Sequence, residues 1–400
     1  MRRPDRTLGL YLHVPFCRAK CAYCEFYSLA RSEEKMDQYT DALIRHLKET
    51  APMADGHTVD TVYIGGGTPS YLGPARIVKL LQSVKKYYHL RKGAEITMEA
   101  NPDSASDVSA LRAVRRAGVN RISLGMQSSD DRQLQAIGRI HTWRQTQSAV
   151  EAIRRAGIEN LSLDLIYGLP DETAAQWEKT VNDALSLRPQ HISCYALKLE
   201  EGTPLWQRRE SLCLPDDDEQ ADRYLFTVDL LHEAGFEQYE ISNFSLPGKE
   251  SRHNLKYWHL EEYAGFGPGA HSDFGGVRYA YARDLDRYLA GDLILSESET
   301  VSTAEREREY LMLGLRTAEG ISRHTFEDRY RRRFSVLEPL FELYEKHGLA
   351  ARTEDGWRLT PAGFFVSNEM IIELEDALTE DTRRRRKKTA AGDFRIEREK

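Results

Sequence analysis

The sequence predicts an α/β protein, a partial (β/α)6 barrel followed by a smaller helical, winged-helix-like α+β domain. The first observation is a repeat: RRAGVNRISLG at 115–125 returns as RRAGIENLSLD at 154–164, and HEAGFEQYEIS at 232–242 echoes both. Each copy ends an amphipathic helix at glycine and then becomes β-rich, which is typical of parallel strands joined by helical crossovers. The second observation is that this pattern stops near residue 245. We therefore expect a barrel domain over 1–245 and a different architecture beyond it.

Six segments of the first domain have the composition of strands, and helical segments separate them. The candidates are 9–14, 61–66, 95–100, 121–126, 160–167 and 191–198. Two intervening helices begin with capping boxes, Thr142 with Gln145 and Thr173 with Gln176. Six β/α units are too few for the closed eight-stranded barrel, so an open partial barrel or a doubly wound sheet is expected. In both architectures ligands bind at the carboxyl ends of the strands.

The rest of the chain divides into three parts. Residues 246–300 are rich in glycine, histidine and aromatics with little periodicity, which predicts an irregular connector. Residues 301–378 read as a C-terminal domain, with a helix opening at the capping box of Ser302 and Glu305, another helix over about 334–347, and a hairpin turning at Asp355-Gly356. Residues 379–400 are a charge run without apolar content, which predicts a disordered tail.

Composition restricts the class of protein. The chain has 400 residues, 40% of them hydrophobic, and a net charge of −7. An acidic chain is not steered onto nucleic acid by its overall field, so no nucleic-acid partner is expected. No apolar run approaches the roughly 20 residues of a membrane helix, and no signal peptide is recognised, so a cytoplasmic protein is the default. The basic run 383–388 is interpreted as a solvated end, with peripheral membrane contact as the alternative.

Three of the five cysteines, Cys17, Cys21 and Cys24, lie directly after the first predicted strand. Thiolates are soft ligands, and such clustering predicts a metal or cluster site in a reducing compartment. Structural zinc prefers four protein ligands, and only His13, inside the strand, is a nearby fourth candidate. A cubane iron–sulfur cluster held by three cysteines instead leaves one iron open to a small molecule. An iron–sulfur site is favoured over zinc and over accidental clustering.

Polar residues also stand at the ends of later strands. The glycine run at 65–67 lets the backbone approach a ligand closely, although a tight turn alone would also explain it. Glu99 could accept hydrogen bonds from ribose hydroxyls, or could be a solvated strand end. Asp164 lies in an apolar strand and is costly to bury without a partner, for which Arg139 or a ligand hydroxyl are the candidates.

A strand followed by CxxxCxxC and an aromatic, at the start of a six-unit β/α chain, resembles the radical S-adenosylmethionine (SAM) superfamily. The resemblance implies a [4Fe–4S] cluster on Cys17, Cys21 and Cys24, with SAM bound to the open iron and cleaved by an electron to an adenosyl radical. It also implies a set of SAM contacts. These are Tyr11, Tyr23, Gly66, Gly67, Thr68, Glu99, Gln127, Arg139, Asp164 and Ala196.

The motifs YLHVPFCRAKCAYCEF, YIGGGTPS, DLIYGLPDET and HNLKYW with GFGPGAHS resemble the HemN/HemW group within that superfamily. The oxidase branch, oxygen-independent coproporphyrinogen III oxidase, has a fourth cysteine where Phe26 stands and a longer segment before the first cysteine. Both departures favour the haem-chaperone branch, without oxidase activity, and the oxidase remains the alternative. The resemblance then implies haem as a further ligand and recipient haemoproteins, including membrane-bound respiratory enzymes, as partners. It leaves a homodimer open.

Within that group, His253, Tyr257 and Trp258 of HNLKYW would contact haem. A neutral imidazole can ligate haem iron, and aromatic rings offer flat faces to a porphyrin. A histidine in an aromatic segment is more often a packing residue, and His271 is a competing ligand. Cys194 and Cys213 are interpreted as core or surface thiols.

Overall fold

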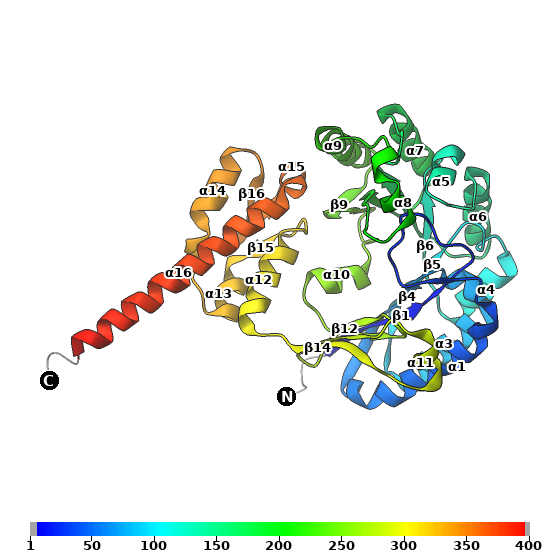
Figure 1. The fold of residues 1–400 in the computed structure, drawn as a ribbon, viewed down its shortest axis with the longest axis horizontal. Helices are drawn as coiled ribbons and strands as arrows, with labels where there is room; N and C mark the ends of the chain where they lie inside the picture. The colour runs from blue at the N-terminus through cyan, green and yellow to red at the C-terminus, as the bar shows by residue number, and fades with distance from the viewer. Residues whose placement is uncertain (1–5, 397–400) are drawn as a thin grey trace. The chain divides into compact units, whose positions relative to one another are not determined.

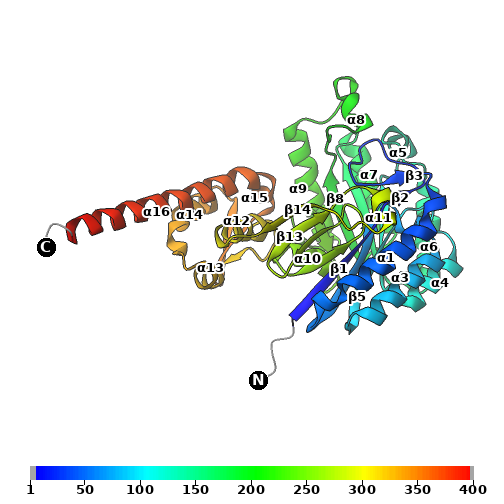
Figure 2. The same ribbon diagram turned by 60° about the horizontal axis from the view of Figure 1, so that its bottom comes forward.

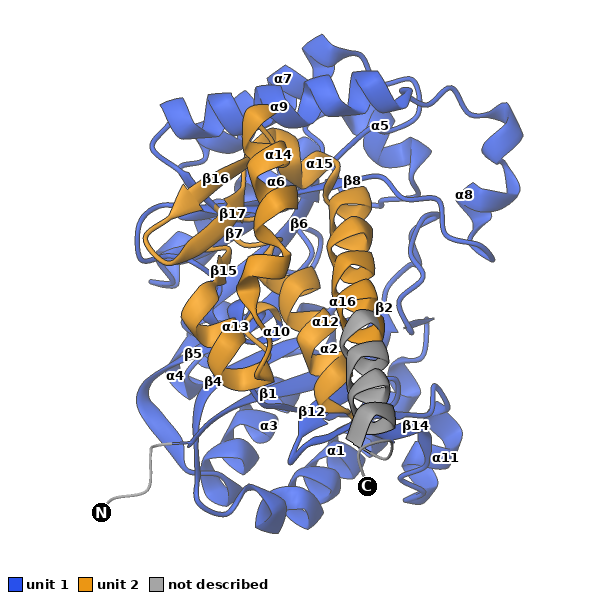
Figure 3. Ribbon diagram, turned by 90° about the vertical axis from the view of Figure 1, so that its left-hand side faces the viewer, with its two compact units in different colours: residues 1–238, 242–257, 261–300 blue, residues 239–241, 258–260, 301–400 orange. Residues whose placement is uncertain are grey.

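A computed structural model describes residues 6–396 of the chain, and the side chains of residues 6–383. The chain forms two compact units, which Figure 3 colours separately. The first comprises residues 1–238, 242–257 and 261–300, and the second comprises 239–241, 258–260 and 301–400. Each unit has its own buried core, and each is described here by itself.

The first unit is built on a curved sheet whose centre is parallel (Figure 1). The central strands, in spatial order, are β1 (Arg6–Val14), β4 (His57–Gly66), β5 (Leu90–Ala100), β6 (Arg121–Gln127), β7 (Asn160–Tyr167) and β8 (His191–Ala196). Each pairs in parallel with its neighbour. Among the described residues the sheet ends at β14 on one side and β9 on the other, so it does not close. The predicted partial (β/α)6 barrel is confirmed.

Helices connect the central strands and lie along the outer face of the sheet in both views (Figures 1 and 2). The principal ones are α1 (Met36–Thr50), α3 (Pro74–Tyr87), α4 (Val108–Ala117), α6 (Trp143–Arg155), α7 (Ala174–Ser186) and α9 (Asp217–Glu233). The capping boxes predicted at Thr142 and Thr173 are both formed. Each box satisfies two of the backbone N–H groups that a helix leaves unpaired at its start.

Alternation along the strands decides which side chains face the helices and which face the concave side. In β6, Ile122, Leu124 and Met126 are fully buried in the apolar core. The alternate residues of the strand, Ser123, Gly125 and Gln127, line a cavity on the concave side. Because successive strand residues point to opposite faces, this pattern places an apolar layer under the helices and a polar layer in the lumen.

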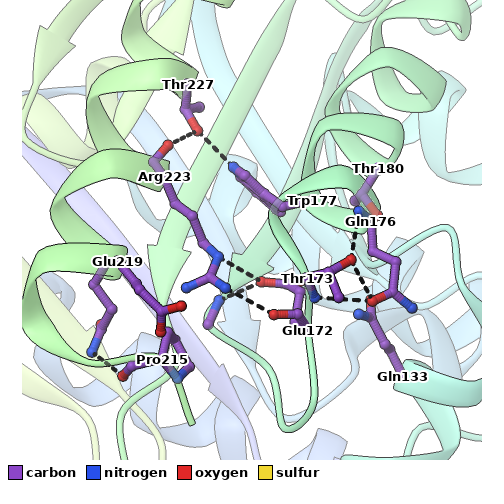
Figure 4. A network of polar contacts seen from close by, with 12 residues as sticks. Gln133, Glu172, Thr173, Gln176, Trp177, Thr180, Pro215, Glu219, Arg223 and Thr227 are labelled. Carbon is purple, nitrogen blue, oxygen red and sulfur yellow. Dashed lines mark hydrogen bonds and ion pairs between the residues drawn. The ribbon is translucent and has the colours of Figure 1, made fainter.

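A buried polar network holds the loop that follows β7 (Figure 4). The Glu172 carboxylate accepts the backbone N–H of Gly168 at 2.7 Å, and Arg223 Nη2 of α9 donates to the Glu172 carbonyl at 2.8 Å. Burial raises the pKa of Glu172 to about 7. Trp177 Nε1 of α7 donates to Thr227 Oγ1 of α9 at 2.8 Å. These bonds tie α7 and α9 to each other and to the loop at the carboxyl end of β7.

Residues 246–300 differ from the irregular connector that was predicted. They form α10 (Arg252–Trp258), β11 (Tyr263–Phe266), β12 (His271–Phe274), β13 (Val277–Tyr281), α11 (Leu285–Ala290) and β14 (Leu295–Thr300). β11 pairs in parallel with β1, and the later strands continue the same sheet in antiparallel fashion. The prediction was wrong because the glycines are turns between short strands: Gly275 and Gly276 both have positive φ, and Phe274 pairs with Val277 around them.

The third repeat also departs from the expected pattern. α9 does end before a glycine in the left-handed region, Gly235. The strand beside β8, however, is β10 (Asn243–Ser245), and it runs antiparallel to β8. β9 (Glu237–Glu240), which follows the repeat directly, lies beyond β10 at the edge of the sheet. The run of parallel crossovers therefore stops at β8.

The second unit combines helices with a small antiparallel sheet. Its elements include α12 (Thr303–Gly314), β15 (Ile321–Ser322), α13 (Arg323–Tyr330), α14 (Glu338–Lys346), β16 (Ala350–Thr353), β17 (Gly356–Leu359) and α16 (Ser367–Ile396). The capping box at Ser302 is formed. The hairpin turn is Glu354-Asp355, one residue earlier than predicted, because Thr353 pairs with Gly356. Phe341 stacks between Phe334 and Trp357 in the core.

The tail that was predicted to be disordered from residue 379 is instead the continuation of α16 as far as Ile396. Arg332 anchors the start of this stretch: its Nη1 donates to Thr382 Oγ1 and its Nη2 to the Leu378 carbonyl, both at 2.7 Å. Arginine, lysine and glutamate are also good helix formers, so charge alone did not exclude a helix. Residues 397–400 lie outside the described part of the chain.

Candidate functional site

A cavity of about 380 Å³ opens on the concave side of the sheet in the first unit. All three clustered cysteines line it, and so do the predicted SAM contacts with one exception. The predicted residues that line it are Cys17, Cys21, Tyr23, Cys24, Gly66, Gly67, Thr68, Glu99, Gln127, Arg139, Asp164 and Ala196. These residues come from segments spread over most of the barrel, and the fold brings them to one place.

The cysteine loop starts at β2 (Phe16–Cys17) and is held from two sides. Ala22 N–H donates to the Ile137 carbonyl at 2.9 Å, and Leu205 N–H donates to the Ala22 carbonyl at 2.8 Å. Tyr23 packs against the buried Ile137, Ile166 and Leu169. Burial raises the pKa of the Cys17 and Cys24 thiols. Because an uncompensated thiolate is costly there, a cationic group such as cluster iron would stabilise the ionised form.

His13 does not serve as a fourth ligand beside the cysteines. Its Nδ1 is hydrogen-bonded to Tyr11 OH at 3.0 Å, and its Nε2 to the Tyr27 carbonyl at 2.8 Å. Burial lowers its pKa to about 4. Within the described residues, no group of three His, Cys, Asp or Glu side chains is placed to hold a single metal ion. The thiols instead border one cavity, an arrangement that fits a cluster whose irons each take one cysteine.

The glycine run after β4 is required by close packing. A Cβ on Gly66, whose φ is +111°, would lie 2.6 Å from the His13 ring, and a Cβ on Gly67 would lie 2.7 Å from the Phe16 carbonyl oxygen. The N–H of Gly66 donates to Glu99 Oε2 at 3.0 Å. The glycines thus bring the backbone against the cysteine loop and aim one N–H at a carboxylate in the cavity.

Glu99 is a buried carboxyl group facing the cavity. Tyr63 OH donates to its Oε1 at 2.8 Å. Its pKa is raised to about 7, first by burial and further by the nearby Asp164, although the bonds from Tyr63 and Gly66 oppose the shift. A carboxyl group poised near neutrality favours a ligand with a positive charge or hydroxyl donors, which would hold it ionised.

Arg139 supplies a positive charge to the same cavity. Its Nη1 donates to Asn101 Oδ1 and its Nη2 to Tyr23 OH, both at 3.0 Å, while its buried Nε has no hydrogen-bond partner in the described structure. Gln127 stands nearby with a φ of +63°, a left-handed conformation that is strained for a residue other than glycine. A fixed guanidinium of this kind suits the carboxylate of an amino acid.

The hydrogen-bond partners of the Asp164 carboxylate differ from the predicted partner Arg139. Arg139 does not contact it in the described structure; its hydrogen bonds come from three serines. Ser123 Oγ and Ser193 Oγ donate to it at 2.7 Å and 2.9 Å, and Ser162 Oγ at 3.3 Å. Ser162 is on β7 with Asp164, whereas the pairing of β6 and β8 with β7 brings Ser123 and Ser193 to the carboxylate. Burial nevertheless raises the pKa of Asp164.

Tyr11, His253, Tyr257 and Trp258 do not line the cavity. Tyr11 lies behind it, hydrogen-bonded to His13 and with its ring 6.2 Å from that of Tyr63. Its contact with SAM stays a prediction. Trp258 belongs to the second unit.

His253 is enclosed rather than open to a ligand. It is only 1% exposed, its Nδ1 is bonded to Thr61 Oγ1 at 2.9 Å, and its Nε2 to Tyr257 OH at 2.8 Å. Its ring stacks on Tyr63 at 5.3 Å, and burial lowers its pKa to about 3. In this conformation both ring nitrogens of His253 are hydrogen-bonded, and its contact with haem stays a prediction.

Sequence reasoning missed several residues that line the same cavity. Tyr63, Thr97, Asn101, Arg121 and Tyr195 are among them. The period-2 pattern could have found most of them, because Thr97 lies two residues before Glu99 and Arg121 two before Ser123 on the same strand faces.

Comparison with known proteins gives two family matches. The model of the radical SAM superfamily matches residues 11–184, and the model of the HemN C-terminal domain matches residues 301–366. The chain is 36% identical to "Heme chaperone HemW" of Bacillus subtilis over 372 residues, covering 90% of this chain and 97% of that protein. It is 35% identical to the protein of the same name from Escherichia coli over 372 residues, covering 91% and 97%.

Among solved structures, the chain resembles the coproporphyrinogen III oxidase HemN from Escherichia coli. The TM-score is 0.80 with 22% identity, over 94% of this chain and 91% of that chain. At this identity the similarity concerns the fold. In the described part of the chain, no helix has both the length and the apolar character needed to cross a membrane.

Proposed function

Because the chain belongs to the HemW family within the radical SAM superfamily, we propose that it is a haem chaperone that carries a [4Fe–4S] cluster and SAM. In this proposal it takes up haem and passes it to haemoproteins. The observation that carries the proposal is the convergence of Cys17, Cys21 and Cys24 with Glu99 and Arg139 on one cavity. Cytoplasmic location and recipient proteins such as membrane-bound respiratory enzymes are further parts of it.

Cys17, Cys21 and Cys24 would hold the cluster, and Thr68 Oγ1, 3.5 Å from Cys17 Sγ, would support the first thiolate. When bound, the cluster supplies an open iron and an electron to SAM. Arg139 would bind the SAM carboxylate, and the carboxylate of Glu99 would pair with the positive charge of SAM. The rest of the SAM molecule would be enclosed by the ring of Tyr23 and by the backbone of Gly66, Gly67 and Ala196. Gln127 and Asp164 would be polar contacts.

Aromatic side chains at the cavity support haem as a ligand. Phe26, at the position of the oxidase's fourth cysteine, is 64% exposed, and Tyr195 is 42% exposed. Both line the cavity, and flat apolar faces of this kind suit a porphyrin ring. Of the two histidines weighed as iron ligands, His271 is exposed and His253 is enclosed. His271, however, does not line the cavity that Phe26 and Tyr195 border, so its exposure alone does not make it the iron ligand, and haem contact by His253, Tyr257 and Trp258 stays a prediction.

The proposal is tested with full-length protein reconstituted anaerobically. We expect about four irons per chain, saturable binding of SAM, and a stoichiometric absorption change on titration with haem. Haem-loaded protein should then restore activity to a haem-free recipient enzyme. Material without iron, or material that binds no haem, would refute the chaperone function.

The same preparation distinguishes the oxidase alternative. It is incubated with coproporphyrinogen III, SAM and a reductant, and the products are separated by chromatography. We expect no protoporphyrinogen IX, because Phe26 replaces the fourth cysteine of the oxidase motif. Turnover to that product would make the oxidase the correct function.

A further inference from the structure

The lower end of the cavity is lined by polar residues that are not among the predicted SAM contacts. We call this end the cavity floor; it consists of Thr97, Arg121, His191, Ser251 and Asn254, all of which line the cavity. Thr97 and Arg121 are paired neighbours on β5 and β6. The segment before Asn254 reaches the same point, because Arg121 Nη1 donates to the Lys249 carbonyl at 2.9 Å.

Arg121 is a buried cation without a carboxylate partner. It is 2% exposed, and its Nη1 donates to Asn160 Oδ1 and to the Lys249 carbonyl, both neutral acceptors. In the described residues no ion pair joins it to an acidic side chain, and its Nε and Nη2 make no hydrogen bond. Buried charges are normally paired or fully hydrogen-bonded. An anionic group on a ligand would complete this site.

Two further donors at the floor are also unused. Thr97 Oγ1 is fully buried and has no hydrogen-bond partner in the described structure. The Asn254 side-chain amide lines the cavity, and no hydrogen bond to it is found among residues 6–396. A buried hydroxyl and an amide left open beside a guanidinium form a set of donors for one acceptor group.

The neighbouring carboxyl group does not fill this role. Asp164 takes its hydrogen bonds from Ser123, Ser162 and Ser193, and no ion pair joins it to Arg121 in the described residues; burial raises the pKa of Asp164, and the charge of Arg121 only partly offsets this. His191 is engaged by Ser162 at its Nδ1, at 2.8 Å, and burial keeps it neutral by lowering its pKa. The three serines therefore supply the hydrogen bonds of Asp164, and Arg121, Thr97 and Asn254 have no side-chain hydrogen bond to an acidic group in the described residues.

We propose that the cavity floor binds a carboxylate, with Arg121 as the cationic partner and Thr97 and Asn254 as hydrogen-bond donors. The carboxylate belongs either to a propionate arm of a tetrapyrrole, which rests on the proposed function, or to a small free carboxylic acid. A carboxylate accepts several donors at once and matches the planar fork of arginine.

The test compares haem with haem dimethyl ester, in which both propionates are esterified, and adds sodium propionate as a small probe. Affinities are measured on full-length wild type and on Arg121→Gln, with Arg144→Gln, an exposed arginine of α6, as the matched control. We expect wild type and the control to prefer haem over the ester by about tenfold or more, since charge-assisted hydrogen bonds are lost with the ester. Arg121→Gln should remove that preference.

Thr97→Val keeps the shape of the side chain, so it tests the site even if Arg121→Gln does not fold. It should reduce the preference for haem over the ester by a few-fold while leaving SAM affinity unchanged. Propionate binding that depends on Arg121, with equal binding of haem and ester, would assign the floor to a small free acid.

Three results would overturn the carboxylate site. One is equal binding of haem and ester together with no Arg121-dependent binding of propionate. Another is an Arg121→Gln variant that loses SAM as strongly as haem, because the guanidinium would then belong to the SAM site. The last is a folded Arg121→Gln protein that retains the preference. By contrast, wild type that binds no haem refutes the proposed chaperone function, and the propionate measurement still tests the floor.

Discussion

The cavity rim around the cysteine loop and His253 of helix α10 differ in how their polar groups are satisfied before a ligand binds. At the rim, Arg139 Nε and Ser28 Oγ are buried without hydrogen-bond partners, and Glu99 has a pKa raised to about 7. In α10, both nitrogens of His253 are hydrogen-bonded and its ring is stacked on Tyr63. Both regions carry motifs that point to ligands. In this structure the rim therefore keeps polar groups available to a ligand, whereas the ring nitrogens of His253 are both engaged.

The two regions are nevertheless joined. His253 stacks on Tyr63, and Tyr63 OH donates to Glu99 at the rim. The start of α10 is fixed from the same sheet, because Glu95 accepts the N–H groups of Arg252 and His253. In this structure the HNLKYW segment therefore supports the wall of the cavity rather than presenting an iron ligand.

The largest effect expected is on the cluster. Cys21→Ser should lower the iron content of reconstituted protein from about four per chain to near zero, because a cubane held by two thiolates is not retained. Iron analysis and the visible absorption of anaerobic samples measure it. Cys213→Ser, an exposed thiol away from the cavity, is the control and should keep both signals. Retained colour in Cys21→Ser would place the cluster elsewhere.

In α10 we expect an effect on stability. His253→Ala should lower the free energy of unfolding by about 2–4 kcal/mol, since it leaves a cavity and unpairs Thr61 and Tyr257. His271→Ala, at an exposed position, should change it little. Urea unfolding of cluster-free protein measures both. If His253→Ala keeps full stability and loses only haem, the motif is a ligand site after all and the comparison fails.

At the rim, Arg139→Gln should weaken SAM binding by about tenfold to a hundredfold, because a charge-assisted contact to the SAM carboxylate is lost. The iron content should stay unchanged. Equilibrium binding of SAM to reconstituted protein measures the effect, with the exposed Arg132→Gln of α5 (Asp131–Ala136) as control. Unaltered affinity would remove Arg139 from the SAM site.

The smallest effect expected is on the pH dependence of SAM binding. Burial raises the pKa of Glu99 to about 7, and a cationic ligand favours its ionised form. Binding should therefore release a proton and strengthen as the pH rises, by about tenfold between pH 6 and pH 8. Calorimetry in buffers of different ionisation enthalpy measures the released proton. Glu99→Gln should flatten the profile, and an unchanged slope in this variant would assign the proton to another group.

Much of the barrel could be predicted because its signals are local. Each of the six predicted strands overlaps a central strand of the sheet, and the capping boxes at Thr142, Thr173 and Ser302 all form. Residues 246–300 were misjudged because short strands with glycine turns carry weak periodicity. The Gly275-Gly276 pair was the available signal for a hairpin.

Predictions about the site likewise succeeded where the signal was local. The cysteine spacing and the strand-end motifs lie in contiguous segments, so the sequence alone identified the groups that line the rim of the cavity. Other features of the site depend on partners from distant segments. These are the serines that surround Asp164, the donors that remain open on Arg121, and the engagement of the His253 nitrogens. A hydrogen bond is a property of two groups and their separation, and only the folded sheet brings those groups together. The chemistry of each side chain was therefore set by the sequence, while its availability to a ligand was decided by the tertiary structure.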